Sequence, residues 1–172
     1  MKVLIESPDD LQQGDLEEII ASCGSFLTLR EGVIYFVHQS AKDYLLEKAS
    51  HQILPDGIAR QHHALFLRSL EALSTTLRRD IYNLVTPGFP IDRVSPPNPD
   101  PVAAIRYSCV SWVDHLDESE LASSVDRVRQ VSNAIDHFVR TKYLHWLECL
   151  GLLCSMSEGV MAVQKLVNIA VS

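Results

Sequence analysis

The residues of this 172-residue chain that could do chemistry are its seven histidines and four cysteines. A zinc site needs several His or Cys ligands at short, regular spacing, and no cluster here has zinc-finger spacing. His62 and His63 are adjacent, so they point to different faces of the helix predicted around them. Cys149 and Cys154 lie among leucines, where a thiol usually behaves as a small hydrophobic side chain. We therefore predict neither a metal site nor a reactive thiol.

Nucleotide hydrolysis needs a phosphate-binding loop, in which closely placed glycines are followed by Lys and then Ser or Thr. The seven glycines of the chain are dispersed and none opens such a pattern. His145 and Glu148 have helical spacing, but a di-metal bundle would need matching carboxylates on partner helices, and the chain has no second copy of the pair. We predict that they lie on a solvated edge beside Trp146, and that the chain has no catalytic residues and is not an enzyme.

His38 differs from the other histidines because it follows the predicted strand Val33–Val37 and stands where the next helix begins. A side chain at such a junction can reach a bound ligand. The alternative is structural, since a histidine there can also cap the helix or satisfy a buried carbonyl. The residues alone leave both alternatives open.

The charge and composition of the chain argue against two classes of partner. The formal net charge is −7 with histidine neutral, which gives no general attraction to nucleic acid or to anionic lipid. The sequence contains neither a signal peptide nor an apolar run long enough to span a bilayer. The cysteines are scattered through apolar stretches, so we expect a cytoplasmic protein in a reducing compartment, with no nucleic-acid or membrane partner.

Residues 1–50 have the pattern of the second part of a winged helix. A short helix is predicted from Leu16 to Ser22, with Gly24 as its stop. Two β-favouring runs, 26–30 and 33–37, are separated only by Glu31-Gly32, which predicts a hairpin. A helix then starts at Gln39 and fades around Ala49. The order helix, β-hairpin, helix predicts a partial winged helix.

Residues 51–172 are predicted to form an irregular helical bundle, so the fold class is mainly α. Six of the eight prolines fall between Pro87 and Pro101, which predicts an extended connector over 85–101, held against a surface. The pair Asp100-Pro101 is typical of a helix start, and Trp112 should be buried in the helix that follows. The other helical stripes contain Phe66, Leu70, Leu73 and Leu77; Val128, Val131, Ile135 and Phe138; Tyr143, Trp146, Leu147 and Leu150; and, after a Ser155-x-x-Glu158 capping box, Val160, Val163, Val167 and Ala170.

Several segments of the chain resemble one protein family. Cys23–Gly32 followed by Tyr35–Leu45 is similar to the winged-helix signature of fungal NACHT signalling ATPases of the heterokaryon-incompatibility type. Segments similar to the helical region after the wing extend the resemblance over nearly the whole chain: 77–84, 87–92, 107–116, 142–148 and 155–159. The first residues, 1–11, depart from the family pattern, and we expect the chain to be a fragment or a truncated gene product.

The resemblance implies a role for His38, which falls on the histidine that touches the bound diphosphate in related signalling ATPases. In that family an upstream NACHT domain binds ATP/ADP or GTP/GDP, and a downstream repeat domain, often a WD propeller, recognises the trigger. The chain itself would hold no cofactor. Its implied partners are those two domains of the same protein, with homo-oligomers possible in the parent.

The resemblance thus favours a regulatory and scaffold segment that couples nucleotide state to a downstream sensor. The alternative is a stand-alone winged-helix module that binds DNA or another protein. Charge weighs against DNA, because Asp9, Asp10, Asp15, Glu17 and Glu18 lie in and before the candidate recognition helix, with no Lys or Arg among them.

Overall fold

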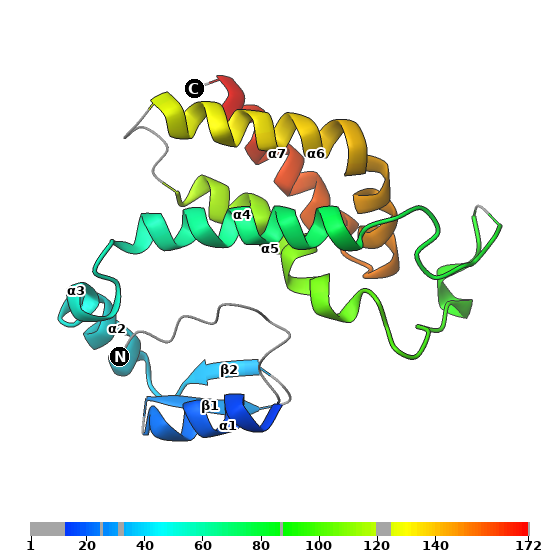
Figure 1. The fold of residues 1–172 in the computed structure, drawn as a ribbon. Coiled ribbons are helices and arrows are strands. Elements are labelled where there is room, and N and C mark those ends of the chain that lie inside the picture. The colour runs from blue at the N-terminus through cyan, green and yellow to red at the C-terminus, as the bar shows by residue number, and fades with distance from the viewer. Residues whose placement is uncertain (1–12, 25, 31–32, 87, 120–124, 172) are drawn as a thin grey trace. The chain divides into compact units, whose positions relative to one another are not determined.

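The structure is a computed structural model that describes residues 13–24, 26–30, 33–86, 88–119 and 125–171 (Figure 1). Its internal contacts divide the chain into two compact units, Met1–Gly57 and Ile58–Ser172, called here the first and the second unit. Helices dominate, and the described strands form one antiparallel hairpin. The prediction of a mainly α fold is confirmed.

The first unit has the predicted order of helix, hairpin and helix. Its elements are α1 (Gln13–Ser22), β1 (Leu27–Arg30), β2 (Val33–Phe36), α2 (Gln39–Glu47) and α3 (Ser50–Ile53). The first helix begins three residues earlier than predicted, and the predicted turn at Glu31-Gly32 lies outside the described residues. Whether these elements belong to a winged helix stays a prediction.

The hairpin and α1 form the small core of the first unit. Leu27 pairs with Phe36 and Leu29 with Ile34 across the antiparallel strands. Helix α1 contacts β1, and Ile20 on α1 is 7% exposed. Beyond α1, Gly24 has a φ of +62°, a backbone conformation that glycine adopts without a steric penalty, so this residue ends the helix as predicted.

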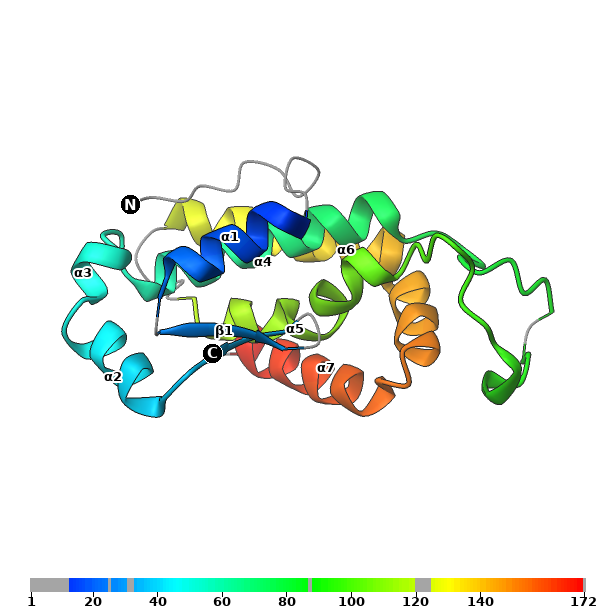
Figure 2. The same ribbon diagram turned by 90° about the horizontal axis from the view of Figure 1, so that it is seen from below.

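The second unit is built from four main helices that follow the predicted hydrophobic stripes. They are α4 (Ile58–Thr76), α5 (Arg106–Asp117), α6 (Val125–Leu152) and α7 (Met156–Val171), with short 3-10 turns η2 (Ile91–Arg93) and η3 (Ala103–Ile105). Figures 1 and 2 show α4 running beside α5, while α6 and α7 form an antiparallel helical hairpin that packs on them. Where α7 crosses α6, a Cβ added at Gly159 would meet Leu150 Cδ1 at 2.5 Å, so a larger residue there would require the Leu150 side chain to move.

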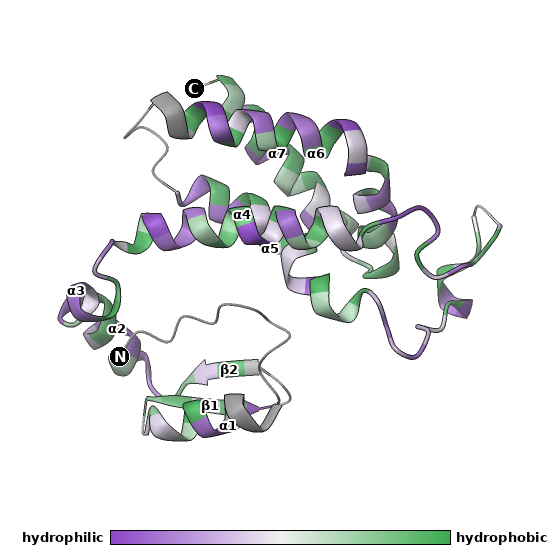
Figure 3. Cartoon of the chain, in the orientation of Figure 1, coloured by the Kyte–Doolittle hydropathy of each residue, from purple (hydrophilic) through white to green (hydrophobic). Residues whose placement is uncertain are grey.

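Aromatic side chains fill the centre of the second unit. Trp112 is 1% exposed, which confirms its predicted burial. Its ring stacks on Phe66 from α4 at a centroid distance of 6.3 Å and meets Trp146 from α6 edge to face at 5.8 Å. Phe138 contacts both tryptophan rings. Figure 3 shows hydrophobic residues alternating with hydrophilic ones along these helices, the pattern that lets each bury one face.

Two predicted helix boundaries in the second unit are wrong. Helix α5 begins at Arg106 and not at Pro101, because the Asp100 carboxylate caps a separate turn by accepting a hydrogen bond from the Val102 amide at 2.9 Å. Two predicted stripes, 128–138 and 143–150, belong to the single continuous helix α6. No glycine or proline lies between them to break it.

The predicted capping box at the start of α7 does not form. Ser155 Oγ donates to the Leu153 carbonyl at 3.3 Å, and the Glu158 carboxylate accepts from Ser157 Oγ at 2.7 Å. Each side chain is therefore engaged locally, and neither reaches across the first turn of α7 as a capping box requires.

The proline-rich connector is anchored at its ends and exposed in its middle. Ile81 and Val102 are 2% and 0% exposed, and the Tyr82 hydroxyl donates to Asp100 at 2.9 Å, which ties the two ends together. Between them the segment projects away from the helices of the second unit in both views (Figures 1 and 2), and Phe89 is 40% exposed. The predicted connector is thus held at its ends but does not lie along a surface.

Candidate functional site

His38 occupies the junction of β2 and α2, where the sequence placed it. Its backbone is extended, with φ −138° and ψ 148°, and its carbonyl accepts a hydrogen bond from the Ala41 amide at 3.0 Å. The imidazole makes no capping hydrogen bond to the helix, and the residue is exposed. The alternative in which its side chain caps the helix is therefore not what the structure shows. The imidazole is available to a ligand.

The first turn of α2 beside His38 is free of acidic side chains. Gln39 Nε2 donates to Asp43 Oδ1 at 3.0 Å, so this amide is directed along the helix and does not cap its start. The first amides of any helix lack intrahelical acceptors and carry partial positive charge. A histidine beside them is chemically suited to an anion such as a phosphate group.

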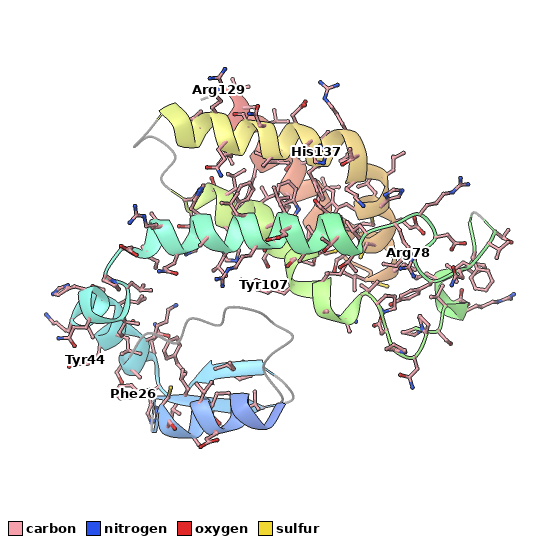
Figure 4. All side chains as sticks on the ribbon, viewed as in Figure 1. Phe26, Tyr44, Arg78, Tyr107, Arg129 and His137 are labelled. Atoms are coloured by element: carbon pink, nitrogen blue, oxygen red, sulfur yellow. The ribbon has the colours of Figure 1, made fainter. Side chains whose placement is uncertain are left out.

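An exposed apolar surface adjoins His38 in the first unit, and we call it the hairpin surface. It consists of Phe26, Tyr35, Phe36, Val37 and Tyr44, which are between 40% and 56% exposed. Figure 4 labels Phe26 and Tyr44 on this unit. A concavity of about 530 Å³ is lined by Thr28, Arg30, Tyr35, Phe36 and Val37. Apolar groups gathered in this way mark an interaction surface more often than a free one.

A row of hydrogen-bonding side chains in the second unit was not predicted. His115 on α5 is 8% exposed; its Nε2 lies 2.6 Å from the Tyr107 hydroxyl and its Nδ1 lies 3.2 Å from Nδ1 of His62 on α4. Burial and the neighbouring His62 lower the pKa of His115, against an opposing effect of Asp114. The two facing nitrogens can share one proton but cannot both carry one. The two histidines are 53 positions apart, a separation too long for the sequence to show that they meet.

The pair His145 and Glu148 does not lie on a solvated edge, so that prediction is wrong. Glu148 Oε2 accepts a hydrogen bond from the Asp80 amide at 3.2 Å and thereby fixes the turn after α4. His145 Nδ1 is buried and has no hydrogen-bond partner among the described residues. Trp146 between them is 1% exposed, as expected of a core residue. Both side chains are half-buried, and Glu148 has a structural role through its bond to the Asp80 amide.

Within the part of the chain that the structure describes, no group of three or more His, Cys, Asp or Glu side chains could hold a metal ion. Nor does any helix of that part combine the length and apolarity needed to cross a bilayer. Among the described residues of the first unit, His38 is an exposed histidine at the junction of a strand and a helix.

Comparison with known proteins gives one informative match. No family model matches the chain, and no solved structure does. The chain is 46% identical over 179 aligned residues to the vegetative incompatibility protein HET-E-1 of Podospora anserina. The alignment covers 95% of this chain but 13% of that protein. The resemblance inferred from the motifs is confirmed: nearly the whole chain is similar to one segment of a much longer fungal vegetative incompatibility protein.

Proposed function

We propose that the chain is a non-catalytic regulatory segment of a nucleotide-gated fungal signalling protein of the NACHT type. The observation that carries the proposal is the 46% identity to a vegetative incompatibility protein over 95% of the chain. An incompatibility response must stay silent until a trigger arrives, so its protein needs an element that holds the resting state. The first unit is the segment to which we assign this role.

His38 is the proposed contact with the nucleotide. The nucleotide, ATP/ADP or GTP/GDP, would be held by an upstream NACHT domain, and His38 would donate a hydrogen bond to the terminal phosphate of the diphosphate form. Its exposure and its place before the free amides of α2 support this assignment. A contact made only with the diphosphate state would stabilise the closed protein and would be lost on nucleotide exchange.

The hairpin surface is the proposed docking face for that upstream domain. Tyr35 and Phe36 lie on β2, three and two residues before His38, and both are exposed, so a partner that seats the nucleotide at His38 would dock beside this strand. The second unit would connect the switch to a downstream repeat domain that senses the trigger. In the parent protein, release of the closed state would free the switch for assembly into homo-oligomers.

The test is His38→Ala in an intact parent protein, with retention of labelled diphosphate as the measurement. Loss of a hydrogen bond to a charged group costs about 1.5–3 kcal/mol, so the variant should release the diphosphate roughly 10- to 100-fold faster. The resting activity of the parent should rise with it. His51→Ala is the matched control, because His51 is another exposed histidine of the first unit, on α3.

Normal retention and normal resting activity in the His38→Ala parent would remove the nucleotide role from this residue. The rival function, a DNA-binding winged helix, has a separate test. Helix α1 contains Asp15, Glu17 and Glu18 and no basic residue, so it should repel a phosphate backbone. Salt-sensitive binding of duplex DNA by the chain would favour that rival, whereas salt-insensitive binding of a protein alone would favour an interaction module.

A further inference from the structure

Two buried cysteines from different helices meet in the core of the second unit. Cys109 on α5 and Cys149 on α6 are both 0% exposed, and their Sγ atoms lie 3.2 Å apart in a hydrogen bond between the thiols. The residues are 40 positions apart in the sequence, so their meeting is a product of the fold. The other two cysteines differ, since Cys23 is half-buried and Cys154 is exposed.

The helices that carry the pair are fixed to each other at the same level. The Trp146 indole Nε1 donates a hydrogen bond of 2.8 Å to the backbone carbonyl of Cys109. Trp146 precedes Cys149 by three residues and therefore shares its face of α6. A disulfide has an S–S length of about 2.05 Å, so the sulfurs need to close by only about 1.2 Å. Small side-chain rotations can supply such a movement without shifting the helices.

The thiol hydrogen bond also makes the two sulfurs chemically unequal. It lowers the pKa of Cys149 and, together with burial, raises the pKa of Cys109. Arg106 favours a thiolate at Cys149, while burial, Asp100 and Glu148 oppose it. Because the thiolate is the form that attacks an oxidant, the sulfur of the pair that loses its proton is the one that reacts first.

We infer that Cys109 and Cys149 form a reversible dithiol–disulfide pair that ties α5 to α6 when the chain meets a peroxide. The thiolate of one cysteine attacks one oxygen of hydrogen peroxide, giving a sulfenic acid and hydroxide, and the hydroxide takes up the proton that the thiol released. The sulfur of the other cysteine then attacks the sulfenic sulfur; its proton and the departing hydroxyl leave as water. In sum, two thiols lose two electrons and the peroxide is reduced to two waters.

Burial determines how fast this cysteine pair reacts with an oxidant. With both sulfurs fully covered, an oxidant reaches them only when the helices around them open locally, so the rate of reaction follows the opening of the second unit. Once formed, the disulfide closes a loop across α5 and the long helix α6 and resists their separation. A thiol such as Cys23 or Cys154, which is not buried, lacks this property and can react with outside partners at any time.

The experiment uses the full chain with Cys23→Ser and Cys154→Ser, which leaves the core pair as its only thiols. The reduced protein is treated with hydrogen peroxide in native buffer, unfolded, alkylated and digested for mass spectrometry. We expect a cross-linked peptide containing Cys109 and Cys149 that disappears on reduction with dithiothreitol. The midpoint of thermal unfolding, followed by far-UV circular dichroism, should rise by on the order of 10 °C in the oxidised form.

Cys149→Ala in the same background gives the matched control, with no cross-link and no rise in the midpoint after peroxide. The inference is overturned if both thiols remain open to alkylation after peroxide treatment of the native protein. It is also overturned if the cross-link forms only in denaturant, or if the oxidised protein melts at a lower temperature than the reduced one. Either of the last two results would mean that the fold does not accommodate the bond.

Discussion

In the part of the chain that the structure describes, only the second unit has a core of buried aromatic side chains. In the second unit Trp112 and Trp146 are each 1% exposed and contact other rings. In the first unit Tyr35 and Tyr44 are 50% and 56% exposed. Among the described residues of the first unit, the apolar side chains that count as buried are Ile20 and Ala49. The second unit thus has a closed aromatic core, although its Phe89 and Tyr107 are exposed, whereas all the described aromatic side chains of the first unit are exposed.

This difference supports the proposal that the first unit docks against a partner. Burial of a large apolar side chain contributes about 1.5–3 kcal/mol, so the second unit gains its stability from its own core. In the first unit the apolar side chains of the hairpin surface, next to His38, are exposed and therefore add little to the free energy of unfolding. A surface of this kind gains stability when another domain covers it, which is how a docking element should behave.

The largest expected effect comes from Trp112→Ala in the second unit. Removing a fully buried aromatic side chain that contacts Phe66, Phe138 and Trp146 should cost about 3–5 kcal/mol. Both tryptophans belong to the second unit, so fluorescence of the remaining Trp146 during urea unfolding reports this unit alone. Leu144→Ala, at a side chain that is 75% exposed on α6, is the control and should change little. Equal effects of the two substitutions would contradict a core centred on Trp112.

A smaller change in stability is expected when the pH is lowered. It arises in the row formed by Tyr107, His115 and His62. The pKa of His115 is lowered in the folded protein by burial and by His62, while Asp114 opposes the shift. As pH falls below the unfolded value of about 6.5, the unfolded chain takes up the proton before the folded one. Stability is therefore fully present above that pH and decreases as the solution becomes more acidic.

The measurement is the urea midpoint of the second unit between neutral and mildly acidic pH, again by tryptophan fluorescence. His115→Gln keeps a hydrogen-bonding side chain but does not titrate, so its midpoint should vary less with pH than that of the parent chain. His137→Gln, at an exposed position on α6, should leave the pH dependence unchanged. An undiminished acid effect in His115→Gln would assign the dependence to other groups.

The sequence predicted the elements better than it predicted their contacts. Stripes such as Phe66, Leu70 and Leu73 identify a buried helical face because that information is local. The start of α5 was misplaced because the capping signal at Asp100 serves a separate turn and the Tyr82 hydroxyl, a partner 18 residues away. The position of His38 between a strand and a helix was predicted, whereas the exposure of its side chain was not. The pairs Cys109–Cys149 and His62–His115 could not be predicted, because only the packed helices bring them together.

The smallest expected effect on stability comes from the hairpin surface, with Tyr35→Thr and Phe36→Thr combined. Threonine keeps the β preference of the strand, and substitutions of exposed side chains usually change stability by within about 0.5 kcal/mol. The alkylation rate of half-buried Cys23, at the end of α1, reports opening of the first unit and should stay the same. Self-association at high concentration, measured by sedimentation velocity, should fall, whereas Leu144→Ala should not reduce it. A loss of several kcal/mol would instead place the two rings in a core of the first unit, and the contrast between the units would then fail.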